Sequence, residues 1–230
     1  MTDAGSSRRL AITGTLSAAL TGLAVVGVFL VAPEDADQGI IQKIFYFHVA
    51  IAIAALLAFG VACVYGIRYL HSRQERFDEI SSILIGIGLG LSVLVVVTGS
   101  IWAKASWGTW WVWTDPRLVT FVIVLLLYAA YFVLRQTVED ETRRATFAAV
   151  FAIIAFVDVP ITFFATRFLP EGLHPVVIGP GGGGMEGSMA VSFAICMLGM
   201  TLLLAAMIRR DYEIELIKDR VSDLKTSLGG

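Results

Sequence analysis

The stretch ISSILIGIGLGLSVLVVVTGSIWA, from Ile80 to Ala103, contains no charged side chain and decides the class of fold. A helix of this length spans the ~30 Å hydrocarbon core of a bilayer at ~1.5 Å rise per residue. Five further apolar stretches occupy residues 10–32, 44–67, 118–134, 145–166 and 187–208. The composition agrees, because 57% of residues are apolar and 16% are charged, and the mean hydropathy is +0.79. We therefore expect an all-α polytopic membrane protein with six transmembrane helices.

Lysine and arginine fall mainly on one side of these six spans. Thirteen of the 17 lie in the termini and in the connections after the second and fourth spans, and the other side holds only Lys43, Lys104, Arg117 and Arg167. Because cytoplasmic segments retain positive charge, both termini are predicted to be cytoplasmic. The loops 33–43, 104–117 and 167–186 then face outward from a cell membrane. Arg8 and Arg9 could begin a cleaved secretory signal, but the stretch after them is long for one, and we expect a retained span.

The chain divides at the end of the sixth span. Residues 1–208 are predicted to form the transmembrane domain and residues 209–230 a cytoplasmic tail. Apolar residues recur in the tail at alternating spacings of three and four: Ile214, Ile217, Val221, Leu224 and Leu228. This pattern predicts an amphipathic helix that either lies on the membrane surface or docks on a partner. The net charge of −2 provides no polybasic surface for nucleic acid.

Two other features have simple structural interpretations. Cys63 and Cys196 fall inside predicted spans, where a thiol packs easily, and no C-x-x-C-H sequence would hold a haem covalently. The glycine-rich run 179–184 lacks the Lys-Ser or Lys-Thr of a phosphate-binding loop and is predicted to be a hinge. Any work driven by a nucleotide would therefore be done by a partner.

The second outer loop, together with Trp102 just before it, holds every tryptophan of the chain. Five fall within 12 residues: Trp102, Trp107, Trp110, Trp111 and Trp113. An interfacial aromatic belt would spread its tryptophans among all span ends. Concentrated in one loop, they form a broad aromatic surface that suits a flat, partly apolar ligand at the membrane boundary, such as haem.

Two histidines are predicted to share the outer face with this loop. His48 lies about one turn into the second span, and His174 lies in the loop before the sixth. A lone histidine near a membrane surface is usually a hydrogen-bonded structural residue. Two histidines that flank a tryptophan loop suit axial ligation of a haem iron from opposite sides. The third, His71, lies among arginines on the cytoplasmic side.

The tryptophan loop resembles the "WWD" motif of the haem-handling membrane proteins of cytochrome c maturation. The matching residues are Trp107-Gly108-Thr109-Trp110-Trp111-Val112-Trp113 and, after Thr114, Asp115-Pro116-Arg117-Leu118. The segments from Gln42 to Val49 and from Asp158 to Pro160 also resemble segments of this superfamily. With about 230 residues and six predicted spans, the chain is similar to cytochrome c maturation protein C, the haem exporter protein C family.

This resemblance implies a haem handler rather than an enzyme. Such a protein binds haem b non-covalently and transiently at the outer face of the membrane and presents it to a membrane-anchored haem chaperone. A small membrane subunit and an ATP-binding-cassette module are the implied associates. The implied axial ligands are His48 and His174, and the remaining implied site residues are Trp107, Gly108, Trp110, Trp111, Trp113, Asp115 and Arg117.

Charged residues suggest two further hypotheses. Lys104, Arg117 and Arg167 are candidates to pair with the haem propionates. Asp158 is the only charge inside an apolar stretch. It either orients a ligand histidine or caps the backbone gap opened by Pro160.

Two other classes of protein stay open. An electron-transfer membrane cytochrome would hold a bis-histidine haem permanently, usually from ligands on facing helices. A secondary transporter would interrupt its spans near the midplane, and the segment 158–160 is the one candidate for such an interruption.

Overall fold

The computed structural model describes residues 4–35, 38–168, 173 and 187–228. The described residues contain no β-strand. The helices are α1 (Ala4–Val26), the π-helix η1 (Gly27–Val31), the 3-10 helix η2 (Ile40–Lys43), α2 (Ile44–Ser72), α3 (Glu75–Trp107), α4 (Pro116–Thr137), α5 (Glu141–Phe156), α6 (Asp158–Phe168) and α7 (Gly187–Leu228). Six spans within this part of the chain are long and apolar enough to cross a membrane. The predicted all-α fold with six transmembrane helices is confirmed.

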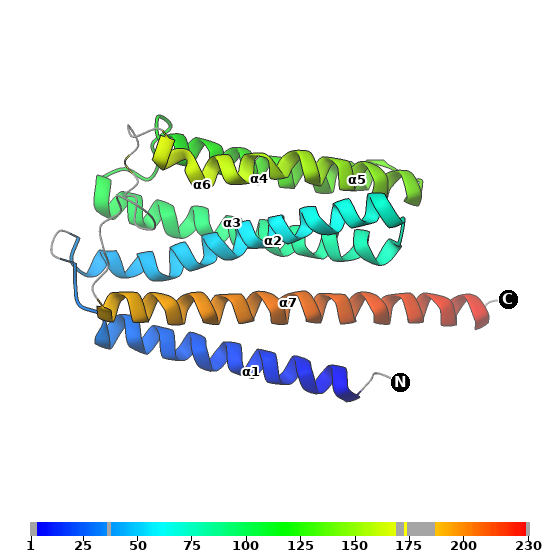
Figure 1. The fold of residues 1–230 in the computed structure, drawn as a ribbon, viewed down its shortest axis with the longest axis horizontal. Coiled ribbons are helices and arrows are strands. Elements are labelled where there is room, and N and C mark those ends of the chain that lie inside the picture. The colour runs from blue at the N-terminus through cyan, green and yellow to red at the C-terminus, as the bar shows by residue number, and fades with distance from the viewer. Residues whose placement is uncertain (1–3, 36–37, 169–172, 174–186, 229–230) are drawn as a thin grey trace.

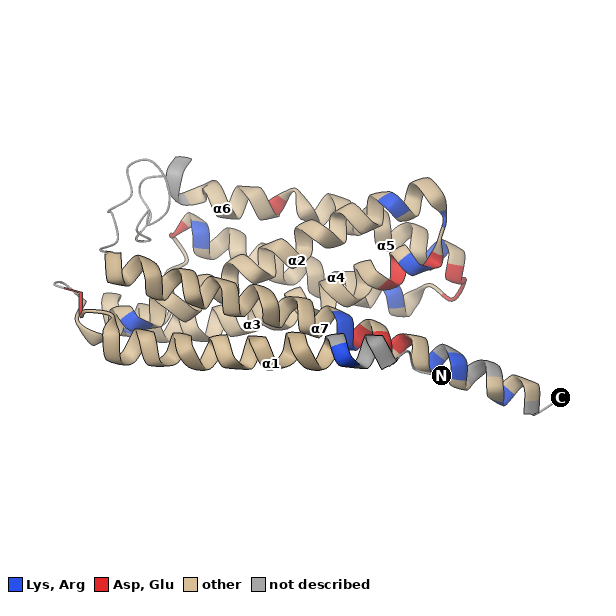
Figure 2. Ribbon diagram, turned by 60° about the horizontal axis from the view of Figure 1, so that its bottom comes forward, with Lys and Arg blue, Asp and Glu red and all other residues tan. Residues whose placement is uncertain are grey.

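The helices form one elongated bundle (Figure 1). Along one side α1 packs mainly against α7, α2 and α3 occupy the middle, and α4 lies beside α5 and α6 on the far side. The start of α1 and the end of α7 lie at the same end, and the connection between α3 and α4 lies at the other (Figure 1). Charged residues gather mostly at the end that carries the termini (Figure 2). That this end is cytoplasmic stays a prediction.

The first span ends in an unusual turn. Residues Gly27–Val31 form a π-helix, a form that is rare and occurs mostly as a single turn. Lys43 is only 7% exposed, and its ammonium donates a hydrogen bond of 3.2 Å to the Phe29 carbonyl oxygen in this turn. The bond joins the end of the first span to the start of the second.

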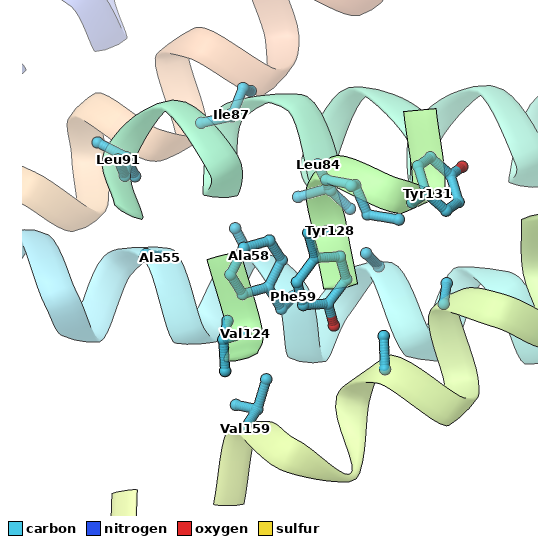
Figure 3. Close-up of a cluster of buried hydrophobic side chains, with 14 of the residues drawn as sticks. Ala55, Ala58, Phe59, Leu84, Ile87, Leu91, Val124, Tyr128, Tyr131 and Val159 are labelled. Atoms are coloured by element: carbon cyan, nitrogen blue, oxygen red, sulfur yellow. The ribbon is translucent and has the colours of Figure 1, made fainter. Parts of the chain in front are cut away.

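Small residues allow close contact at the centre of the bundle, as is common between membrane helices. Phe59 of α2 stacks on Tyr128 of α4 with ring centroids 3.7 Å apart (Figure 3). Gly88 of α3 leaves room for this stack, since a Cβ atom there would lie 2.6 Å from Phe59 Cε1. Cys63 and Cys196 are buried and free, in agreement with the packing role predicted for them.

The fifth span is interrupted at Val157, between α5 and α6. Pro160 lacks the N–H group that would continue the helical hydrogen bonds through this turn. Asp158 Oδ2 is buried and has no hydrogen-bond partner among the described residues. The carboxylate therefore does not cap the gap through this oxygen.

The last helix is longer than a membrane span. α7 has 42 residues and continues without a break to Leu228, so the described part of the tail extends the axis of the sixth span beyond the bundle (Figures 1 and 2). The apolar residues Ile214, Ile217, Val221 and Leu224 are 37–61% exposed on it. The tail is helical as predicted, but it points away from the bundle instead of bending across its end. The boundary at residue 208 stays a prediction.

Candidate functional site

The tryptophan loop is held between two helix caps. α3 ends at Gly108, whose left-handed φ of +76° favours glycine, and the Lys104 ammonium donates to the Gly108 carbonyl oxygen over 2.9 Å. α4 begins with Asp115 as N-cap and Pro116 in its first turn. The Asp115 cap explains why α4 begins at Pro116, two residues before its apolar stretch.

The five tryptophan rings differ in how far they are exposed. Trp102 is 5% exposed in the last turns of α3, whereas Trp110 and Trp113 are 58% and 70% exposed. Trp107 and Trp111 are half-buried, and the Trp111 and Trp113 rings lie 5.9 Å apart. The loop therefore offers two open aromatic rings, and the ring of Trp111 lies beside that of Trp113.

His48 lies next to the part of α3 that carries the first tryptophans. Its ring centroid is 6.1 Å from that of Trp102, which is in turn 6.1 Å from that of Trp107. Trp102 Nε1 donates to Gln38 Oε1 over 3.0 Å and so fastens the first outer loop to α3. The structure thus brings His48 close to Trp102, whose ring lies beside that of Trp107 at the end of α3.

Two residues of α3 hold the His48 ring. Its Nδ1 atom lies 2.9 Å from Thr98 Oγ1, at hydrogen-bond distance. A Cβ atom on Gly99 would lie 2.9 Å from His48 Cε1, so only glycine fits there without a shift. Sequence reasoning missed both residues, because Thr98 and Gly99 are 50 positions away in an apolar stretch and carry no local signal.

Asp115 is a buried anchor, 2% exposed. Its Oδ1 atom accepts from the N–H groups of Arg117 and Leu118, at 2.9 and 3.2 Å. Its Oδ2 atom accepts from the N–H group of Leu173 over 2.8 Å. One carboxylate therefore joins the tryptophan loop to the segment that bears His174. His174 itself and the glycine run 179–184 lie outside the described residues.

Trp111 contributes an unused donor to the site. Its Nε1 atom is buried and has no hydrogen-bond partner among the described residues. Buried indole N–H groups usually find an acceptor. A carboxylate-bearing, flat aromatic ligand such as haem would provide one, so the donor set of the loop fits such a group.

The outer cations differ in how they are engaged. Lys43 is buried against Phe29, and Lys104 is exposed but bonded to Gly108. Arg117 is half-buried in the first turn of α4. The Arg167 side chain lies outside the described side chains. Among the candidate propionate partners, Arg117 follows the anchor Asp115 by two residues in the sequence.

Asp158 does not serve as the partner of His48 Nδ1. That atom lies at hydrogen-bond distance from Thr98 of α3. An orienting role of Asp158 therefore does not act through His48 Nδ1, and the role of Asp158 stays a hypothesis.

The fold and the site define a polytopic helical membrane protein with an aromatic surface beside His48, at the end of the bundle opposite its termini. The family model described as Heme exporter protein C matches residues 3–227, and the chain belongs to this family. The family resemblance predicted from the tryptophan loop is confirmed.

Relatives named Heme exporter protein C align with most of the chain. The protein of Bradyrhizobium diazoefficiens is 29% identical over 229 residues, which cover 96% of this chain and 87% of that protein. The protein of Paracoccus denitrificans is 31% identical over 174 residues, or 76% and 70% of the two chains. The Escherichia coli K12 protein is 27% identical over 200 residues, or 82% and 81%.

Proposed function

We propose that this protein binds haem b non-covalently at the tryptophan loop, on the outer face of the cell membrane, and presents it for cytochrome c maturation. The family name, Heme exporter protein C, supports a haem-handling role. The observation that carries the proposal is the position of His48, whose ring lies 6.1 Å from that of Trp102 at the start of the tryptophan loop.

The residues of the chain take different roles in this proposal. His48 and His174 are the axial ligands, and the open rings of Trp110 and Trp113 provide a flat surface for the haem. Haem b supplies an iron with two axial positions and a pair of carboxylates. Arg117 and the Trp111 indole N–H are the groups proposed to bind these carboxylates.

Gly108 and Asp115 support the loop rather than contact the haem. Gly108 ends α3 in a left-handed conformation, and both Asp115 oxygens already accept hydrogen bonds from backbone N–H groups. Trp107 packs beside Trp102 and backs the open rings. The aromatic surface is thereby held in place before haem arrives.

Exposure of the loop favours a haem that is released over one that is held permanently. Trp110 and Trp113 are more than half exposed, so a haem lying on them stays accessible from outside the membrane. We propose that a membrane-anchored haem chaperone takes the haem from this open side. A small membrane subunit and an ATP-binding-cassette module are the proposed associates, and the electron-transfer cytochrome is the less supported alternative.

A haem titration followed by tryptophan fluorescence tests this proposal. All five tryptophans lie within residues 102–113, so the emission reports on this loop alone, and haem bound there quenches it. Replacing Trp110 and Trp113 together by alanine should weaken haem binding roughly tenfold, at ~0.5–1.5 kcal/mol for each aromatic contact.

Phe147→Ala is the matched control for this titration. Phe147 is a 51% exposed aromatic side chain near the start of α5, at the other end of the bundle. Its replacement should leave haem affinity unchanged. Equal haem affinity in the wild type and in the double tryptophan variant would contradict the proposed site.

A further inference from the structure

Thr98 makes hydrogen bonds that restrict the position of its single proton. Its Oγ1 atom lies 2.8 Å from the Leu94 carbonyl oxygen and 3.3 Å from that of Val95, and donates to them. The same oxygen lies 2.9 Å from His48 Nδ1. A threonine hydroxyl has one proton and two lone pairs. A hydroxyl that donates this proton to the helix carbonyls has only lone pairs left for His48 Nδ1, and its oxygen then accepts there.

This arrangement selects one tautomer of the His48 imidazole. An oxygen that accepts from Nδ1 requires the proton of the neutral ring to be on Nδ1. The lone pair is then on Nε2, at the far side of the ring from Thr98. Back-bonding of a threonine to the carbonyl four residues earlier is common in helices, so α3 can hold the acceptor in a fixed orientation.

We propose that Thr98 is a positioning residue that keeps His48 in the Nδ1–H tautomer and so presents Nε2 to the haem iron. The inference rests on the proposed function in that His48 is an iron ligand. Gly99 helps to hold the His48 ring. A Cβ atom at this position would lie 2.9 Å from His48 Cε1, so a side chain has no room there. Hydrogen bonds to the second nitrogen of a ligand histidine commonly fix its tautomer and orientation and raise its basicity.

The tautomer can be measured in the haem-free protein. The chain has three histidines, so ¹⁵N-histidine NMR of the detergent-solubilised protein gives few signals, and His48→Ala assigns the one of interest. The wild type should show the Nδ1–H tautomer at His48. Thr98→Val keeps the side-chain shape without the hydroxyl and should lose this preference, whereas Thr98→Ser should keep it.

Thr201→Val is the control for loss of a threonine back-bond. Thr201 of α7 donates to the Met197 carbonyl oxygen over 2.8 Å in the same way that Thr98 donates to Leu94. Its replacement should leave the His48 signal unchanged. An Nε2–H tautomer in the wild type, or an unchanged tautomer in Thr98→Val, would overturn the inference.

Haem binding gives a second and separate readout. Thr98→Val should weaken haem affinity by about 10–100-fold, the usual cost of losing such a partner, and Thr98→Ser should restore it. An altered tautomer with unchanged haem affinity would overturn the positioning role. If His48→Ala also binds haem like the wild type, the ligand assignment in the proposed function fails instead, so the two failures are distinguishable.

Discussion

Asp115 has more structural duties than any other single side chain of the candidate site. Its carboxylate accepts hydrogen bonds from the N–H groups of Arg117 and Leu118 in the first turn of α4 and from that of Leu173, 58 positions after Asp115. Carboxylates at helix N-termini are stabilised by the N–H groups and by the helix dipole. The residue before His174 is thus attached to the tryptophan loop through one buried group.

Substitutions at Asp115 should separate its role as the N-cap of α4 from its hydrogen bond to Leu173. Asn retains one carbonyl oxygen for the cap of α4, but its amide nitrogen cannot accept from Leu173. Asp115→Asn should therefore speed haem dissociation with a small change in thermal stability, whereas Asp115→Ala should speed dissociation and also destabilise the protein by about 0.5–2 kcal/mol. Haem dissociation rates and thermal unfolding in detergent measure the two effects.

Asp140→Ala is the control for loss of a cap alone. Asp140 is the N-cap of α5 and accepts from the Arg143 N–H group over 2.8 Å, at the end of the bundle far from the tryptophan loop (Figure 1). It should lower stability without affecting haem dissociation. If Asp140→Ala and Asp115→Asn speed haem release equally, Asp115 has no specific role at the site.

At the scale of elements, α3 links the core of the bundle to the site. In the core of the bundle its Gly88 leaves room for the Phe59 ring of α2, and nearer the tryptophan loop its Thr98 and Gly99 contact His48, which also belongs to α2. Close packing of α2 on α3 therefore positions the histidine. The pair Asp78–Arg135, joined at 2.7 Å, fastens the other end of α3 to α4.

Gly88→Ala should weaken this packing. The added methyl group would meet Phe59 Cε1 at 2.6 Å, and Phe59 cannot retreat easily because it stacks on Tyr128 at 3.7 Å. Overpacking of this kind costs about 1–3 kcal/mol, which thermal unfolding in detergent would detect. Gly90→Ala is the control, since nothing lies within 4 Å of a Cβ atom there. A Gly88→Ala protein as stable as Gly90→Ala would contradict the account.

The sequence predicted the elements better than the contacts between them. Apolar length was sufficient for the six spans, and the segment 158–160 correctly indicated where the fifth is interrupted. Residues 27–31 carry no local signal for the π-helix Gly27–Val31. The hydrogen bond to its Phe29 carbonyl oxygen comes from Lys43, which belongs to a later element. Thr98 was missed for the same reason: a hydroxyl in an apolar stretch gains its role only when α2 packs beside it.

At the scale of the whole molecule, six spans place the tryptophan loop and the termini at opposite ends of the bundle (Figure 1). The excess of Lys and Arg near the termini predicts that the termini are cytoplasmic and that the loop faces outward. A haem presented there meets partners outside the membrane. The projecting end of α7 would instead be available to cytoplasmic partners.

Thiol labelling in intact cells tests this orientation. Thr114 and Ser72 are exposed at opposite ends of the bundle, and the native Cys63 and Cys196 are buried and should react little. A membrane-impermeant reagent should label Thr114→Cys in intact cells and Ser72→Cys only after the membrane is permeabilised. The reverse pattern would place the tryptophan loop in the cytoplasm.

The visible spectrum of the haem-loaded protein tests the central claim most directly. We would compare the wild type with His48→Ala, His174→Ala, the double variant and His71→Ala, each with and without imidazole. The account predicts that the haem bands change in each of the first two variants, recover with imidazole, and stay unchanged in His71→Ala. Spectra of His48→Ala and His174→Ala that match the wild type would contradict two-histidine ligation at the tryptophan loop.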